Sequence, residues 1–331
     1  MASLRSETSV PRPRIALTCG DPRGIGPEVI AGALGDAAVR AAAEYVLIGP
    51  ERLIPAGTVA GAEVRFEPIG RWPAPGPGPG EVEAGRLSGS AVERAIELAL
   101  RGEVDGVVTA PLSKRALAAA GYPYPGHTEL LQARTGVPEV TMMMAAERTS
   151  LGGPLRLALL TTHIALRDVP SELTVERAVR RAGIAVAALR EWWGMSRPRI
   201  AWAALNPHAS EGGLFGDEEE RVLEHAAARL TAEGGCENLG IFPADTVFRR
   251  CLDGSADAVV VPYHDVGLAV LKTIAPEAGV NITAGLPFPR TSPDHGTAFD
   301  IAGRGICDAR SMTAAILLCA RFCGVHAALS R

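Results

Sequence analysis

Three of the seven histidines in this 331-residue chain, His163, His208 and His264, each follow a run of residues typical of a buried strand. In α/β proteins, residues just past the carboxyl ends of strands commonly form the binding site. Neutral imidazoles suit Zn²⁺, Co²⁺ or Ni²⁺ better than Mg²⁺, and three protein ligands leave positions open for a substrate. The shared placement predicts one catalytic metal site assembled from three distant segments. A hydrogen-bonded structural histidine is the alternative at each position.

The glycine-rich segment Gly20–Glu28 lies between the first predicted strand and the first predicted helix. Glycines such as Gly24 and Gly26 let the backbone approach a ligand, and a helix N-terminus favours an anionic group. The spacing is not GxGxxG, so a standard dinucleotide fingerprint is not supported. The segment is either a ligand loop or a plain tight turn.

A second candidate anion site begins at Gly126, where His127 and Thr128 open a predicted helix. A histidine beside a helix start can donate to a phosphate or a carboxylate. Thr128 could instead be a simple N-cap, which would make the segment structural.

The stretch from Asn281 to Gly305 is polar, rich in glycine and too long for a casual turn. Arg290 can bind a phosphate through two hydrogen bonds, and Lys272 just upstream could add a point charge. Asp300 could accept hydrogen bonds from a ribose and would repel a 2′-phosphate, which favours NAD over NADP. For Lys272 and Arg290 the alternative is a solvated surface pair.

Strand and helix patterns alternate along the chain, which predicts an α/β fold with mostly parallel sheets and helices on both faces. We expect the polar segment 1–13 to be a flexible tail and the Pro/Gly run 73–80 to be a surface loop. The predicted strands are 14–18, 104–109, 140–144, 156–160, 199–205, 256–262 and an extended 280–283; the predicted helices are 27–40, 91–101, 113–120, 174–193, 217–232 and 311–328.

The composition is that of a soluble globular protein, with 47% hydrophobic and 21% charged residues. A net charge of −4 gives no global attraction to nucleic acid or to an anionic membrane, so we expect neither as a partner. The six cysteines are scattered without CxxC spacing, which favours free thiols and a cytoplasmic location.

Taken in order, the motifs GDPRGIGPE, APLSK, GHTELL, TTHIALRDVP, NPHASEGGLFGDEE, PADTVF, YHDVGLAVLK and GVNITAGLPFPRTSPDHGTAFDIAGRG resemble the 4-hydroxythreonine-4-phosphate dehydrogenase family over nearly the whole chain. The first loop and the run 295–305 are also similar to isocitrate and isopropylmalate dehydrogenases. The resemblance implies their two-domain α/β/α fold. We expect a cofactor-side domain of 14–135 plus 285–331 and a metal- and substrate-side domain of 136–284.

The resemblance also implies a homodimer whose active site lies at the subunit interface, with metal ligands from both subunits. It implies NAD and a divalent metal, zinc in the first place and Co²⁺ or Mg²⁺ as alternatives. The implied residues are His163, His208 and His264 for the metal; His127, Thr128, Lys272, Asn281 and Arg290 for the substrate; and Gly24, Gly26, His295, Gly296, Thr297 and Asp300 for the cofactor.

The implied reaction oxidises 4-phosphohydroxy-L-threonine to a 2-amino-3-oxo acid, which decarboxylates to 3-amino-2-oxopropyl phosphate in pyridoxal phosphate biosynthesis. Relatives that act on threonate or erythronate 4-phosphate, or on aromatic dihydrodiols, are alternatives, and so is a metal-dependent hydrolase or aldolase. Lys272, Asp245 and Asp265 are candidate catalytic residues, although Asp265 could instead orient His264. Val266 stands where the family often has glutamine, so we expect it to bear on substrate choice.

Overall fold

The computed structural model describes residues 12–51, 53, 63–72 and 80–329. The predicted tail and the predicted loop 73–80 therefore lie almost wholly outside the described residues. The strands are β1 Arg14–Thr18, β2 Glu44–Glu51, β3 Val64–Arg71, β4 Gly106–Thr109, β5 Thr141–Ala146, β6 Leu155–Leu159, β7 Arg199–Ala203, β8 Glu237–Phe242, β9 Ala258–Val261, β10 Val280–Ala284 and β11 Arg290–Pro293. The α-helices are α1 Gly26–Leu34, α2 Ala37–Ala42, α3 Glu81–Leu100, α4 Lys114–Ala119, α5 His127–Thr135, α6 Val169–Glu172, α7 Val175–Glu191, α8 His225–Glu233, α9 Phe248–Leu252, α10 His264–Ile274 and α11 Arg310–Leu329.

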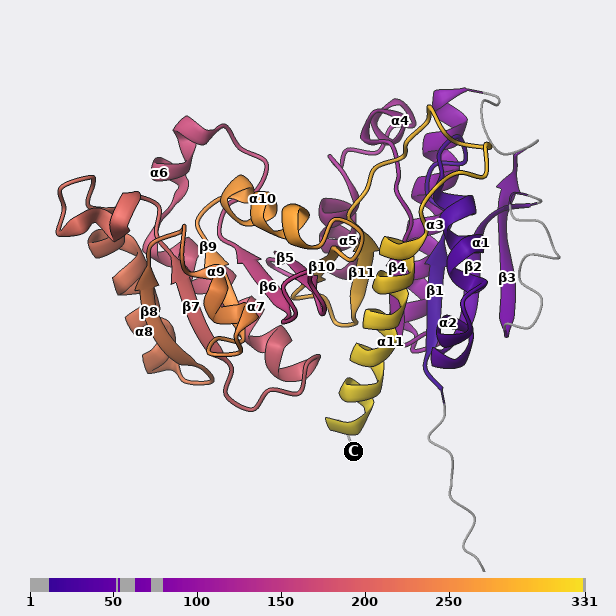
Figure 1. Ribbon diagram of the computed structural model, residues 1–331. Coiled ribbons are helices and arrows are strands. Elements are labelled where there is room, and N and C mark those ends of the chain that lie inside the picture. The colour runs from indigo at the N-terminus through magenta and orange to yellow at the C-terminus, as the bar shows by residue number, and fades with distance from the viewer. Residues whose placement is uncertain (1–11, 52, 54–62, 73–79, 330–331) are drawn as a thin grey trace, which may run out of the picture.

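All of these strands belong to one sheet, in the order β3-β2-β1-β4-β11-β10-β5-β6-β9-β7-β8. The pairs β11–β10, β10–β5 and β5–β6 are antiparallel, and the remaining pairs are parallel. The predicted α/β class with mostly parallel pairing is confirmed. The sheet is continuous through both lobes of the molecule (Figure 1), and the predicted domain boundary at 284/285 falls between two hydrogen-bonded strands. That division remains a prediction.

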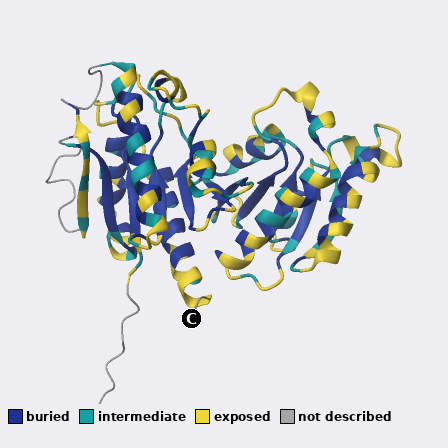
Figure 2. Cartoon of the chain, turned by 180° about the vertical axis from the view of Figure 1, so that it is seen from behind, coloured by how far each residue is buried: buried dark blue, intermediate teal, exposed yellow. Residues whose placement is uncertain are grey.

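Helices cover both faces of the sheet, so its inner strands form the buried middle layer, while the edge strands β3 and β8 are partly exposed (Figure 2). Residues of α1, α7, α8 and α11 join one hydrophobic cluster on one face. On the opposite face α3 and α5 pack in one lobe, and α9 and α10 pack in the other. The β10–β11 pair lies at the junction of the lobes.

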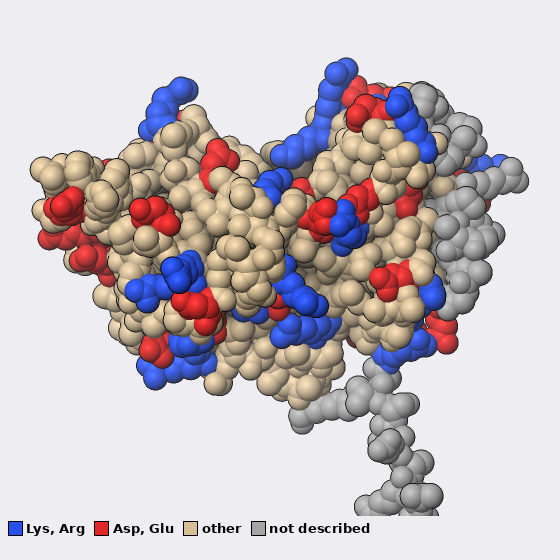
Figure 3. Space-filling model, in the orientation of Figure 1, with Lys and Arg blue, Asp and Glu red and all other residues tan. Residues whose placement is uncertain are grey.

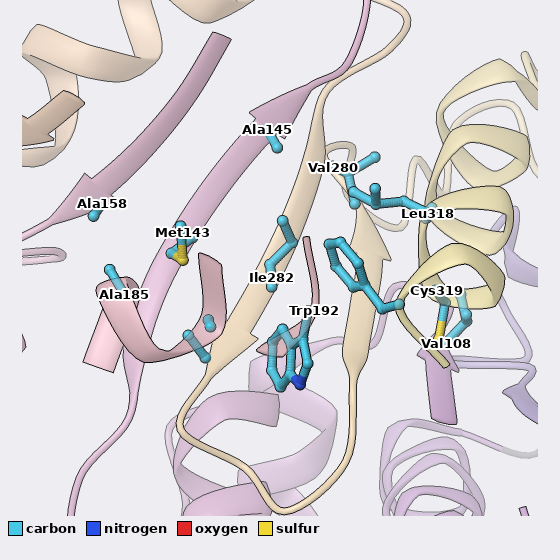
Figure 4. Close-up of a cluster of buried hydrophobic side chains, with 14 of the residues drawn as sticks. Val108, Met143, Ala145, Ala158, Ala185, Trp192, Val280, Ile282, Leu318 and Cys319 are labelled. Atoms are coloured by element: carbon cyan, nitrogen blue, oxygen red, sulfur yellow. The ribbon is translucent and has the colours of Figure 1, made fainter. Parts of the chain in front are cut away.

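The two faces of this central pair differ in polarity because side chains alternate along a strand. Val280 and Ile282 of β10 point into the core formed with α7 and α11 (Figure 4). Asn281 lies opposite Ser292 of β11 in the strand register, so their side chains share the other face. That face also carries Arg290 and forms the floor of a pocket.

Several elements differ from the sequence-based expectation. The predicted helix 27–40 is two helices, because the Asp36 side chain caps a new helix by accepting from the Ala38 N–H at 2.7 Å. The predicted helix 91–101 begins ten residues earlier, at Glu81. No element was predicted at β2, β3, β8, β11, α6, α9 or α10. The strands β3, β8 and β11 and the helices α6 and α9 are short or lack a clean apolar period, so tertiary packing decides their conformation. β2 and α10 do carry apolar runs, Tyr45–Ile48 and Leu268–Leu271, which the prediction overlooked.

The helix α11 is long and apolar enough to span a membrane, and 44% of its apolar stretch is buried. It lies against β4 and β11, where a Cβ placed on Gly106 would lie 2.7 Å from the Cys323 sulfur and 2.8 Å from the Cys319 sulfur. Thr291 of β11 also donates to the Ala315 carbonyl at 2.8 Å. These contacts make α11 a core helix of the sheet. All six cysteines are free thiols.

Candidate active site

A pocket of about 350 Å³ lies over the polar face of β10 and β11. Its floor is formed by Asn281, Arg290 and Ser292. Arg290 is only 2% exposed and donates to the hydroxyls of Thr283 at 2.9 Å and Thr109 at 2.5 Å. These bonds fix the guanidinium at the base of the pocket.

The walls of the pocket come from segments of both lobes. They include Lys114 at the start of α4, His127 and Thr128 at the start of α5, His163 after β6 and Arg181 on α7. Figure 3 shows a notch between the lobes with basic side chains on its right-hand wall. A concave site rich in Lys, Arg and His is suited to an anionic small molecule.

Three nitrogen atoms of the pocket residues are buried without a hydrogen-bond partner, namely His127 Nε2, Arg181 Nε and Arg290 Nε. Arg181 Nε is nevertheless ion-paired with a Glu139 carboxylate oxygen at 2.8 Å. Burial, together with Arg290 and Lys114, holds the pKa of His127 well below its usual value, so its imidazole is neutral at pH 7. Burial lowers the pKa of Arg290 to about 10, which leaves it charged at neutral pH. Unsatisfied buried donors that line a pocket indicate a ligand with acceptor oxygens.

Two of the three predicted metal ligands lie side by side. The ring centroids of His163 and His264 are 5.3 Å apart. His264 is the first residue of α10, and its Nδ1 lies 2.7 Å from a carboxylate oxygen of Asp265. Burial lowers the pKa of His163, with smaller effects of Lys114 and His264. His163 is therefore neutral at pH 7, the form that binds a metal.

The third histidine does not join them within one subunit. His208 lies in a short turn after β7 with its backbone in the left-handed region, at φ 54, and its ring packs 6.3 Å from that of Phe215. No group of three His, Cys, Asp or Glu residues in the described ranges is arranged to hold a metal ion. The predicted trio is therefore not assembled by this single chain.

The candidate catalytic residues lie outside the pocket. Lys272 is on the last turn of α10 and pairs with Asp294 at 3.3 Å. Asp245 is an exposed residue of the turn after β8, and Asp265 is exposed apart from its contact with His264. Among the predicted substrate residues, Lys272 alone does not line the pocket; the other four do.

The two predicted cofactor segments are in direct contact. The Ile25 N–H donates to the Thr297 carbonyl at 3.0 Å, and a Cβ on Gly24 would lie 2.6 Å from that same oxygen. A Cβ on Gly26 would lie 2.2 Å from the Cys19 carbonyl oxygen, so this glycine is required by packing against the end of β1. The glycines thus hold the two segments together, whatever they bind.

Glu28 in the first turn of α1 strengthens this contact by accepting N–H donors from Gly303 and Gly305. At the other end of the second segment, His295 Nδ1 lies 3.1 Å from the Gly296 carbonyl, and His295 Nε2 is buried without a partner. Asp300 is exposed. The two predicted cofactor segments are therefore packed against each other, with Gly24 and Gly26 buried at their contact.

Comparison with known proteins accounts for this arrangement. The family model described as pyridoxal phosphate biosynthetic protein PdxA matches residues 44–319. A 4-hydroxythreonine-4-phosphate dehydrogenase of Geobacter metallireducens is 42% identical, over 95% of this chain and 96% of its own length. The chain belongs to the PdxA family. It is a dehydrogenase, and the resemblance predicted from its motifs is confirmed.

The PdxA family includes relatives with different named substrates. A D-threonate 4-phosphate dehydrogenase of Salmonella typhimurium is 43% identical, over 92% of this chain and 97% of its own length. Among solved structures, a 4-hydroxythreonine-4-phosphate dehydrogenase of Klebsiella pneumoniae matches with a TM-score of 0.77 and 39% identity, covering 94% of this chain and 99% of that one. An isocitrate dehydrogenase of Methylococcus capsulatus, 15% identical with a TM-score of 0.51, covering 92% of this chain and 82% of that one, shares the fold.

Our sequence reasoning did not assign Lys114, Arg181 or Ser292 to the site. The polar-apolar alternation of 290–293 is the signal that could have placed Ser292 on the same face as Arg290. Lys114 and Arg181 carry no such signal, because each reaches the pocket from a helix of otherwise ordinary composition. Val266 packs against a hydrophobic cluster and is not among the residues that line the pocket.

Proposed function

We propose that the chain catalyses the NAD-dependent oxidation of 4-phosphohydroxy-L-threonine at its 3-hydroxyl, followed by loss of CO₂ from the β-keto acid. The observation that carries this proposal is the basic pocket beside the His163–His264 pair. The pocket suits a small molecule with a phosphate and a carboxylate, and the paired imidazoles suit its reacting hydroxyl. The names of the relatives support the same substrate class.

Arg290 and the N-terminal end of α5 would orient this substrate. The N-cap Gly126 has no side-chain hydrogen bond to the helix, so the first N–H groups of α5 are available to an anion. His127 and Thr128 stand at the same helix end, and Arg290 completes the basic surroundings from below. Holding the phosphate there would fix the distance of the reacting carbon from the histidine pair.

The residues present fit a divalent metal, zinc first, with Co²⁺ or Mg²⁺ as alternatives. His163 is neutral, and the contact of His264 Nδ1 with Asp265 leaves Nε2 of His264 free to coordinate. We propose that His208 is supplied by the second subunit of a homodimer, since one subunit does not assemble the trio. Such a metal would supply Lewis-acid stabilisation of negative charge on the substrate hydroxyl.

NAD would bind against the joined segments around Gly24 and Thr297, beside His295, Gly296 and Asp300, with Gly26 packed behind them at the end of β1. Its nicotinamide supplies the hydride acceptor. The exposed carboxylate of Asp300 would repel the 2′-phosphate of NADP.

Lys272, Asp265 and Asp245 are our candidates for proton transfer. Lys272 and Asp265 lie nearest to His264 in the sequence. We place the enzyme in the cytoplasm, where its six free thiols would persist.

D-Threonate 4-phosphate is a second candidate substrate. The relative named for it is as similar to this chain as the relatives named for 4-hydroxythreonine 4-phosphate, at 43% and 42% identity. The two compounds differ in bearing a hydroxyl or an amino group at C2, while the phosphate and carboxylate are shared. The pocket described above suits both.

A substrate panel tests the proposal. The purified protein, loaded with Zn²⁺ or Co²⁺, is given NAD or NADP together with 4-phosphohydroxy-L-threonine, D-threonate 4-phosphate or D-erythronate 4-phosphate. We expect NADH and CO₂ to form in equal amounts, fastest with the amino acid. A protein that forms NADH only with a threonate or erythronate ester would move the assignment to that substrate. No NADH with any of them would refute the proposed substrate class.

A further inference from the structure

Lys114 is a basic residue of the pocket that has no assigned role. It is the first residue of α4, whose start is capped by Ser113 accepting from the Ala116 N–H at 3.2 Å. The cap fixes where the lysine side chain leaves the helix. Its carbon chain passes over the start of α5, because a Cβ placed on Gly126 would lie 3.4 Å from the Lys114 Cε. The ammonium group is thereby brought to the N-terminal end of α5.

Lys114 lines the same pocket as His127 at the start of α5 and His163 after β6. Its charge lowers the pKa of His127, although burial is the largest cause of that shift. Lys114 is therefore near any ligand that occupies this pocket.

No carboxylate in the described part of the chain forms an ion pair with Lys114. The neighbouring residue Arg115 is different, because it pairs with Glu81 at 3.0 Å. Lys114 instead lines the pocket with four other basic side chains: His127, His163, Arg181 and Arg290. The two histidines are neutral and Arg181 pairs with Glu139 at 2.8 Å, so Lys114 and Arg290 are the cations of this lining that no described ion pair neutralises. Glu129 is the acidic residue of the same lining. An anion bound beside Lys114 and Arg290 would be stabilised by both charges.

The same place offers hydrogen-bond donors that lack an acceptor. Arg290 is 2% exposed and has an unpartnered Nε, and His127 Nε2 is likewise buried without a partner. The N–H groups at the start of α5 have no side-chain cap. A tetrahedral anion with several acceptor oxygens would satisfy these groups together, whereas a carboxylate has only two oxygens.

We infer that Lys114 binds the phosphate group of the substrate and thereby selects phosphorylated over unphosphorylated hydroxy acids. The inference rests on the proposed function, since it assumes a phosphorylated substrate. It assigns Lys114 to phosphate binding rather than to hydride or proton transfer.

The test removes the ammonium group and the phosphate separately and then together. The variants are Lys114→Met, Lys114→Arg and, as a matched control on the next residue, Arg115→Met. Each is assayed for kcat/KM with 4-phosphohydroxy-L-threonine and with 4-hydroxy-L-threonine, and for binding of inorganic phosphate by calorimetry. We expect Lys114→Met to lower kcat/KM about 30- to 100-fold for the phosphorylated substrate only, and to weaken phosphate binding at least about tenfold.

Lys114→Arg should keep most of the preference for the phosphorylated substrate, and Arg115→Met should resemble the unaltered enzyme. An equal loss for both substrates in Lys114→Met would overturn the inference and point to a role in the chemical step. Unchanged phosphate binding in Lys114→Met would also overturn it. If the unaltered enzyme shows no preference for the phosphorylated substrate, the proposed function fails instead, and the phosphate titration alone decides the role of Lys114.

Discussion

The imidazole rings of His163 and His264 lie 5.3 Å apart between centroids, although one follows β6 and the other begins α10. The strands that deliver them, β6 and β9, are hydrogen-bonded neighbours, with Leu159 paired to Val261. Because the strands are parallel, both histidines leave the sheet at the same edge. This pairing brings two imidazoles together without any local sequence motif.

The shared metal site makes a prediction that mixed dimers can test. If His163 and His264 come from one subunit and His208 from the other, a dimer of one His208→Ala and one His264→Ala subunit retains one intact site. We expect such mixed dimers, made by co-expression with two tags, to bind metal and to regain activity, whereas each parent variant binds little. Metal content is measured by elemental analysis.

The matching control is a dimer of one His163→Ala and one His264→Ala subunit. In this dimer each site takes its His163 and His264 from a subunit that lacks one of them. Neither site is therefore complete, and no recovery is expected. Recovery in this control, or its absence in the first pair, would contradict the division of ligands between subunits.

The contact between Gly24 and Thr297 predicts that a methyl group added at Gly24 weakens both NAD binding and stability. In Gly24→Ala the new Cβ would lie 2.6 Å from the Thr297 carbonyl oxygen, so the two segments must separate. We expect NAD binding to weaken at least about tenfold and the free energy of unfolding to fall by about 1–3 kcal/mol. Calorimetry with NAD and urea denaturation measure the two effects.

Gly296→Ala is the control for this prediction, because Gly296 lies beside Thr297 in the same segment and a Cβ there meets nothing within 4 Å. Its stability should be nearly unchanged. Equal destabilisation by both substitutions would mean that the packing of Gly24 against Thr297 is not the cause.

The neutral imidazole of His127 predicts how stability depends on pH. Its pKa is lowered in the folded state, so below about pH 6.5 the unfolded chain binds a proton that the folded chain does not. The free energy of unfolding should therefore fall as the pH drops through this range. Replacing His127 with asparagine should make that fall shallower. Urea denaturation at pH 7.5, 6.5 and 5.5 measures it, and a steeper fall in the variant would be the contrary result.

Replacing Arg290 with lysine should lower both activity and stability, although the positive charge is kept. Lysine at this position keeps the charge but presents one compact group to two hydroxyls, those of Thr283 and Thr109. For Arg290→Lys we expect kcat/KM to fall about 100-fold and the free energy of unfolding to fall by about 2 kcal/mol. Steady-state kinetics and urea denaturation provide the two numbers. Normal kinetics in a destabilised variant would restrict Arg290 to a structural role.

The sequence predicted those parts of the fold that depend on local pattern. The core strands after Arg14, Gly106 and Arg199 have unbroken apolar runs, and each forms near its predicted position. β11 was not predicted, because Arg290–Pro293 contains only polar residues and proline. Its conformation is set by hydrogen bonds to β4 and β10, which no local window contains.

The site could be predicted as a set of residues but not as an arrangement. Strand-end placement identified His163 and His264 correctly as neighbours, because parallel neighbouring strands end at one edge. The same rule suggested that His208 would join them, yet the chain leaves β7 through a turn that carries it toward Phe215. Lys114 was missed because an exposed lysine on a helix shows no pattern until its pocket is known.

The unbroken ladder from β4 through β11 and β10 to β5 limits how the notch between the lobes can change its width. β10 is hydrogen-bonded along both edges, so no flexible linker at this point could act as a swivel. Closing over a substrate would have to occur as a change of twist shared by several strands, or by movement of the helices that carry Lys114 and His127. A continuous sheet of this kind favours a small and rapidly reversible narrowing of the notch over a wide rotation of one lobe against the other.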